Sequence, residues 1–140
     1  MEYLIGTVLG LMIAGLAKLL NFDKDRSFYP VILIVIAMYY VLFAFMSENA
    51  DVIIKELIVA LLFSAVAIIG ARLSVLFVAI GLITHGVFDI FHSRFVLNVE
   101  VPLWWPGFCA SIDIVLGIVV LYLMKMRSHN SLQPTAESGG

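Results

Sequence analysis

Five long apolar runs dominate the chain, and short polar segments separate them. Each run is close to the ~20 residues that a helix needs to cross the hydrocarbon core of a bilayer. The runs are long and lack strict alternation of apolar and polar residues, so they predict helices and not strands. Their approximate ranges are 3–20, 30–46, 52–71, 73–91 and 107–126. We therefore expect an all-α bundle of five transmembrane helices over 1–127 and, because its composition is polar, a disordered tail over 128–140.

The breaks between the runs indicate how neighbouring helices connect. Segments 21–27 and 47–51 are short and polar, whereas Arg72 alone interrupts the third and fourth runs. That single break predicts a tight helical hairpin. Pro30 and Pro106 fall in the first turn of their helices, where a missing N–H costs little.

Composition supports a membrane protein and excludes some functions. Hydrophobic residues make up 63% of the 140 residues and charged residues only 13%, against about a quarter in soluble domains. The mean hydropathy is +1.11. We expect the lipid bilayer as a partner and, because no basic patch exists, no nucleic acid. The lone Cys109 excludes an internal disulfide.

Lysine and arginine placement predicts the topology. With the N-terminus outside, the outer side receives only Lys55 and Arg94. The inner side then receives Lys18, Lys24, Arg26, Arg72, Lys125 and Arg127. An excess of positive charge on inner loops is the usual bias of multi-pass proteins. We therefore expect a multi-pass protein of the cell (inner) membrane, with its N-terminus outside and its C-terminus inside.

The fourth run ends in a stripe of ionisable residues. His85, Asp89 and His92 are spaced i, i+4 and i+7, so a helix carries them on one face. At ~1.5 Å per residue, Asp113 on the fifth helix reaches the depth of His85 and Asp89. Glu56 enters on the third helix near the same surface. Ionisable groups at membrane depth are costly and commonly functional, so we expect a shared polar site in the outer half of the bundle.

A divalent metal such as zinc or iron is one interpretation of this site, because imidazole and carboxylate are suitable ligands. The predicted ligands are His85, Asp89, His92 and Asp113. Glu56 or Asp113 is expected to transfer the proton of a metal-assisted reaction. His85 and His92 are about 10 Å apart along the helix axis, so we expect one adjacent pair plus Asp113. The alternative is structural. His85 could pair with Asp113, and Glu56 with Arg94 or Lys55, as glue between helices.

Several short motifs carry a resemblance to known proteins. They are Asp25-Arg26-Ser27-Phe28-Tyr29-Pro30, His85-Gly86-Val87-Phe88-Asp89-x-x-His92 and Val101-Pro102-x-Trp104-Trp105-Pro106-x-Phe108-Cys109. With them the chain resembles a family of small, uncharacterised bacterial five-helix membrane proteins. A looser likeness is to the membrane hydrolases that include alkaline ceramidases and adiponectin receptors. Those proteins place histidines and an aspartate around zinc, but they have seven helices and a second histidine pair that this chain lacks.

Three classes of function stay open at this stage. The first is metal-dependent chemistry on a lipid or amphipathic substrate at the outer leaflet. The second is binding and transport of an ion, a proton or a small molecule, and the third is an accessory subunit of a larger complex. Gly6, Gly10 and Ala14 form a small-residue stripe that could serve a neighbour in the bundle or a homo-oligomer. Trp104 and Trp105 anchor the chain at the interface, or belong to a lid formed by segment 93–106.

Overall fold

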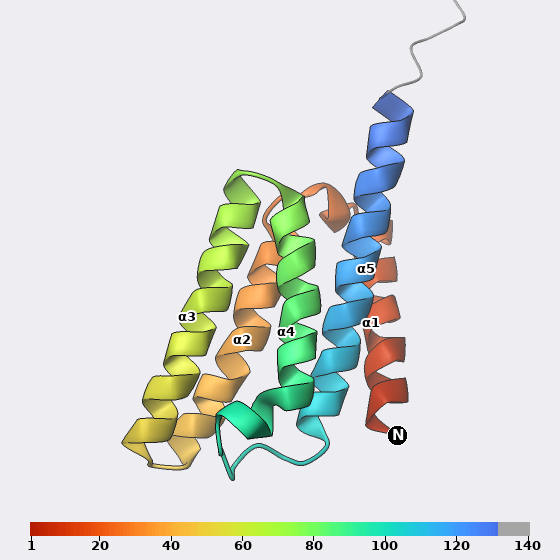
Figure 1. Cartoon of the computed structure of the whole chain (residues 1–140). Coiled ribbons are helices and arrows are strands. Elements are labelled where there is room, and N and C mark those ends of the chain that lie inside the picture. The colour runs from red at the N-terminus through yellow and green to blue at the C-terminus, as the bar shows by residue number, and fades with distance from the viewer. Residues whose placement is uncertain (132–140) are drawn as a thin grey trace, which may run out of the picture.

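The computed structural model describes residues 1–131, which form five helices long and apolar enough to cross a membrane (Figure 1). This confirms the predicted all-α membrane bundle, and no strand occurs within the described range. The elements are α1 (Glu2–Leu19), a short 3-10 helix η1 (Phe22–Lys24), α2 (Phe28–Met46), α3 (Ala50–Arg72), α4 (Val75–Phe95) and α5 (Trp105–Ser131).

Two helices continue further than the apolar pattern predicts. The last helix, α5, runs to Ser131, so the first four residues of the predicted tail are helical. The rest of that tail, 132–140, lies outside the described residues. The fourth helix, α4, runs to Phe95, which shortens the expected connection 93–106 to residues 96–104. Polar residues can extend a helix because continuing the helix satisfies their backbone groups.

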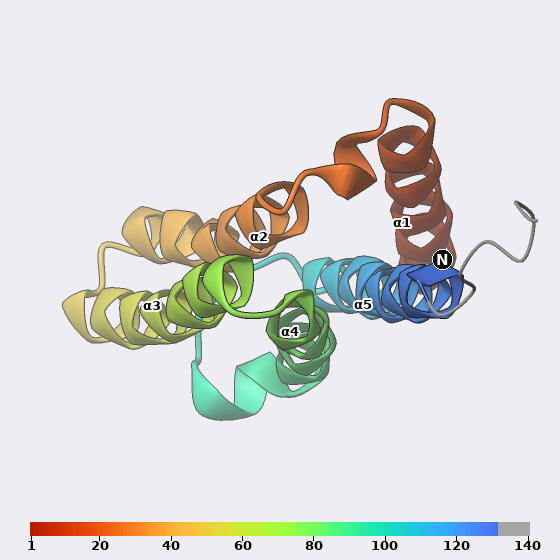
Figure 2. The ribbon, with the colours of Figure 1, turned by 90° about the horizontal axis from the view of Figure 1, so that it is seen from above.

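The helices pack in the spatial order α1, α5, α4, α3, α2. Seen from above (Figure 2), α1 and α2 diverge although they are consecutive in the chain, and η1 connects them. Side chains at two helix starts satisfy backbone N–H groups. Asn49 accepts from Asp51 and Val52 at the start of α3, and Ser74 accepts from Leu76 at the start of α4. The Leu73–Ser74 connection is the tight hairpin that the sequence predicts.

The small-residue stripe of α1 packs inside the bundle. Gly6, Gly10 and Ala14 are all buried. A Cβ added at Gly6 would collide with the Ser111 hydroxyl and the Phe108 carbonyl, both on α5. The stripe therefore allows the close approach of α1 to α5.

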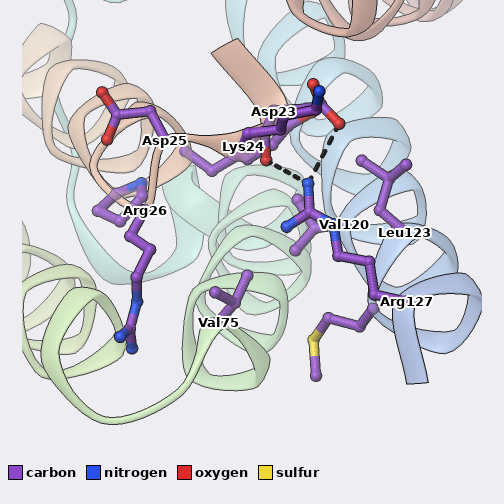
Figure 3. Close-up of a pocket in the computed structure, with 11 residues that line it drawn as sticks. Asp23, Lys24, Asp25, Arg26, Val75, Val120, Leu123 and Arg127 are labelled. Carbon is purple, nitrogen blue, oxygen red and sulfur yellow. Dashed lines mark hydrogen bonds and ion pairs between the residues drawn. The ribbon is translucent and has the colours of Figure 1, made fainter. Parts of the chain in front are cut away.

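The two ends of the bundle differ in charge. One end, called here the basic end, holds η1, the α3–α4 connection and the C-terminal part of α5, and it carries the six basic residues assigned above to the inner side. Arg127 on α5 donates hydrogen bonds there to the carbonyl and the carboxylate of Asp23, at 2.7 and 3.2 Å (Figure 3). The opposite end, called the loop end, holds Met1, the α2–α3 turn and residues 96–104.

An apolar core fills the half of the bundle nearer the basic end. It joins α2, α4 and α5, and its fully buried members include Leu33, Val78, Leu82, Leu116 and Val120. The buried acidic and histidine side chains lie in the other half, towards the loop end. The bundle thus has an apolar half and a half with a polar interior.

Candidate metal centre

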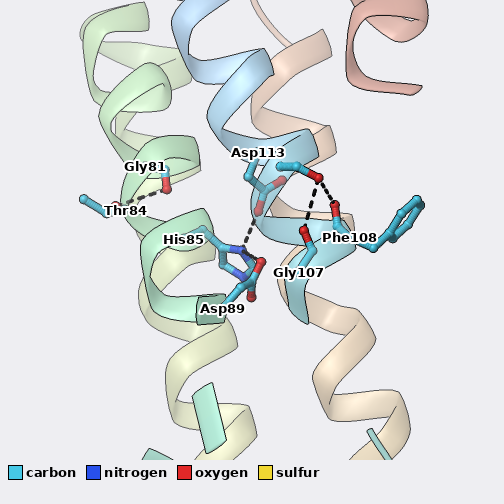
Figure 4. Close-up of polar contacts among 8 residues, drawn as sticks. Gly81, Thr84, His85, Asp89, Gly107, Phe108 and Asp113 are labelled. Atoms are coloured by element: carbon cyan, nitrogen blue, oxygen red, sulfur yellow. Dashed lines mark hydrogen bonds and ion pairs between the residues drawn. The ribbon is translucent and has the colours of Figure 1, made fainter. Parts of the chain in front are cut away.

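A close contact between α4 and α5 positions the site. Gly86 follows His85 directly, and a Cβ built on it would lie 2.9 Å from the Ala110 carbonyl oxygen and 3.2 Å from Cβ of Asp113. Both distances are tighter than ordinary van der Waals contact, so only glycine lets the two helices approach this closely. That approach brings His85 within reach of Asp113 (Figure 4).

His85, Asp89 and Asp113 form one buried cluster. Nδ1 of His85 lies 2.7 Å from Oδ2 of Asp113 and 3.5 Å from Oδ2 of Asp89. Each side chain is at most 1% exposed. One potential ligand atom from each residue lies within 4.8 Å of the other two. Ligand atoms at ~2.1 Å from a zinc ion are at most about 4.2 Å from one another, so a small adjustment would let the three side chains share an ion.

Several atoms of the cluster are buried without a hydrogen-bond partner in the protein. They are Nε2 of His85, both carboxylate oxygens of Asp89 and Oδ1 of Asp113. A buried polar atom without a partner costs free energy, and a buried charge without one costs more. A divalent cation would neutralise two carboxylates beside a neutral imidazole. The residues present therefore fit a metal ion, with one nitrogen and two oxygen donors.

The hydrogen-bond geometry indicates how an ion would fit. Nδ1 of His85 faces both carboxylates, so an ion among the three side chains would replace the proton that this atom shares with Asp113. Metal ligands must be deprotonated, so binding of the ion would release that proton. Three protein ligands with a further open position are typical of catalytic zinc sites.

His92 and Glu56 form a second buried pair outside this cluster. Nε2 of His92 lies 2.7 Å from Oε1 of Glu56, and the Asn98 side-chain amide donates to the same oxygen at 3.2 Å. The structure therefore does not bring His92 together with His85, Asp89 and Asp113. Two helical turns, about 10 Å, separate the two histidines, and His92 reaches α3 whereas His85 reaches α5.

The predicted pair of Glu56 with Arg94 or Lys55 does not form. Lys55 pairs with Asp51 at 2.7 Å, and the Arg94 guanidinium lies over the Phe91 ring, 5.7 Å from its centroid. Glu56 points into the bundle instead, where it is 1% exposed. The expected His85–Asp113 pair does form.

Two residues of the polar half were not predicted as site residues. Tyr40 of α2 stacks on His92 with a centroid separation of 4.1 Å and lies 6.3 Å from His85. It contacts both buried groups, and its buried hydroxyl has no hydrogen-bond partner in the protein. Asn98 follows α4 in a connection without periodicity, so no sequence pattern indicates that it is buried.

A cavity of about 470 Å³ opens at the loop end and reaches the polar half. Asp89, His92 and Asn98 line its polar side, and residues of the 96–103 segment form much of its wall. The α4–α5 connection therefore lies over a route to the cluster, in the position that a lid would occupy. Trp104, on this connection, is 52% exposed, as suits a residue at the membrane interface.

The chain matches no protein-family model, no curated protein and no solved structure. The site is therefore interpreted from its own geometry and chemistry.

Proposed function

We propose that this multi-pass membrane protein binds one divalent metal ion, zinc or iron, with His85, Asp89 and Asp113. The proposal rests above all on one observation, the three carboxylate oxygens of Asp89 and Asp113 that are buried without a hydrogen-bond partner close to Nδ1 of His85. Protons alone could neutralise the carboxylates, but they would leave most of these lone pairs without a partner. One ion bound to Nδ1 and to both carboxylates would neutralise the charge and give these oxygens a partner.

The proposed chemistry is metal-assisted reaction of a lipid or another amphipathic substrate. A bound divalent ion polarises a carbonyl or activates a water molecule. Asp89 and His92 face the loop-end cavity, through which water and a polar group would enter. Glu56 contacts Nε2 of His92 and so fixes the orientation of its ring. His92 lines the loop-end cavity, so it would exchange the proton of the reaction with water there.

The apolar half of the bundle argues against transport through a single chain. Between the cluster and the basic end, Leu33, Leu82 and Leu116 are completely buried. A transported ion would have to cross this layer, where no buried charged side chain among the described residues would partner it.

Elemental analysis of the purified protein tests the proposal. We expect about one zinc or iron per chain in the wild type, and loss of most of it in Asp89→Asn and Asp113→Asn, because each change removes a charged ligand. Asp51→Asn is the matched control, since Asp51 is exposed and pairs only with Lys55. A folded wild-type protein that neither carries a metal nor takes one up on titration would overturn the proposal.

A further inference from the structure

A second cavity, of about 400 Å³, lies between the diverging helices α1 and α2 and is closed on its inner side by α5. We call it the lateral groove. Its wall is almost entirely apolar, with Leu9 and Ile13 from α1 and Val31 and Val35 from α2. These residues belong to membrane-spanning helices, so the groove faces the hydrocarbon of the bilayer.

One side of the lateral groove is polar. Asp113, which is completely buried, lines the groove, and its Oδ1 has no hydrogen-bond partner in the protein. Trp105 lines it nearer the loop end, and its indole N–H is also buried without a partner. The groove therefore leads from the surrounding lipid to one ligand of the proposed metal site.

The polarity of the groove changes along the membrane normal. Tyr39 and Trp105 stand towards the loop end, where Tyr39 packs edge-on to the Trp105 ring at 5.2 Å. Ile13 and Val31 stand deeper, towards the basic end. A lipid in the leaflet at the loop end shows the same change of polarity with depth, with its polar groups near the surface and its chain below.

The polarity of the groove favours a lipid chain over a partner helix. Its wall is apolar over most of its length, and its two unpartnered polar atoms, on Trp105 and Asp113, would face a helix whose own backbone groups are already paired. A single hydrocarbon chain is much narrower and can lie along the floor formed by α5. Water is a poor alternative, because an apolar cavity offers it few polar partners.

We propose that the lateral groove binds one hydrocarbon chain of a bilayer glycerolipid, drawn sideways from the leaflet at the loop end, with its head-group end towards Trp105 and its ester linkage beside Asp113. As a statement about the substrate, this rests on the proposed metal chemistry. As a statement about binding, it rests on the groove alone. The cluster would then be approached from two sides, by the lipid through the groove and by water through the loop-end cavity.

Photolabelling of the full chain tests the binding. The protein is reconstituted in vesicles of palmitoyl-oleoyl phosphatidylcholine that contain a phosphatidylcholine with a diazirine in one chain, and adducts are mapped by mass spectrometry. We expect adducts concentrated on α1, α2 and α5 residues of the groove. Val35→Trp should fill the groove and lower their yield about tenfold, the change that corresponds to a loss of ~1.4 kcal/mol in binding.

Leu61→Trp on α3 is the matched control, because Leu61 and Val35 are both half-exposed aliphatic residues at mid-helix. It should leave groove adducts unchanged. Val31→Trp is a second groove variant in case Val35→Trp does not fold. Labelling that is equal on the groove and on the outer face of α3 would overturn the proposal, and so would cross-links showing a second chain in the groove.

Metal content separates the two proposals. Groove labelling in a protein that binds no metal would refute only the metal site, and a metal-loaded protein without groove labelling would refute only the groove.

Discussion

The imidazole of His85 and the carboxylate of Asp113 lie 2.7 Å apart across the interface of α4 and α5, although 28 residues separate them in the chain. Both side chains are buried at membrane depth, where an ionisable group is costly unless it has a partner. The contact also links two accessible spaces, since Asp113 lines the lateral groove and its neighbour in the cluster, Asp89, lines the loop-end cavity. Its structural role and its proposed chemical role differ in how stability and metal content should respond to substitution.

Gly86→Ala should destabilise the protein and weaken metal binding. The added methyl group would lie against the Ala110 carbonyl and Cβ of Asp113, and overpacking of this kind typically costs about 1–3 kcal/mol. Separation of α4 from α5 would also stretch the His85–Asp113 contact. Thermal unfolding in detergent and metal content measure the two effects.

Gly15→Ala is the control for this substitution. No atom lies within 4 Å of a Cβ built at Gly15, and alanine is a better helix former than glycine by about 1 kcal/mol. We expect unchanged or slightly higher stability and full metal content. Equal effects of the two substitutions would mean that close packing at Gly86 does not hold the site together.

His92→Ala should destabilise the bundle while the metal stays bound. It removes the partner of a buried carboxylate, and breaking a buried pair in this way typically costs about 3–5 kcal/mol. Glu56→Gln should cost less, because the amide oxygen can still accept from Asn98 and from the His92 ring. The free energy of unfolding and the metal content are measured for both. Metal loss in His92→Ala at a temperature where the protein is folded would place His92 among the ligands after all.

Added zinc or iron should raise the melting temperature of metal-stripped protein. An ion that binds only the folded chain stabilises it by about 2.7 kcal/mol at a free concentration one hundred times its Kd. Asp89→Asn should remove most of this increase, because it takes one of the two ligand charges away. An equal increase in the variant would show that the ion binds elsewhere.

The helices could be predicted because the bilayer sets their length and the chain follows that constraint closely. Their ends were harder to predict, as at Phe95 and Ser131, because polar residues extend a helix whenever its backbone groups still need partners. The depth of each residue in the membrane could also be predicted from its position in its helix, and this placed His85 level with Asp113. The structure brings these two together with Asp89.

The direction in which each side chain points was not readable from depth. His92 and His85 share one stripe of α4, yet His92 pairs with Glu56 of α3 and His85 pairs with Asp113 of α5. Which helix lies on which side of α4 depends on the packing of all five. For the same reason the sequence could not show that Tyr40 would touch both histidines, or that Asn98 would fold back onto Glu56.

The topology with the N-terminus outside can be tested by cysteine labelling in a Cys109→Ala background. The positive charges at the basic end favour the inner side, so the loop end should face outward. Leu103 is fully exposed on the α4–α5 connection, so Leu103→Cys should react with a membrane-impermeant maleimide in intact cells. Lys24→Cys, exposed at the basic end, should react only after permeabilisation. The reverse pattern would show that the bundle has the opposite orientation in the membrane. The loop-end cavity and the Trp105 end of the lateral groove would then lie at the inner leaflet.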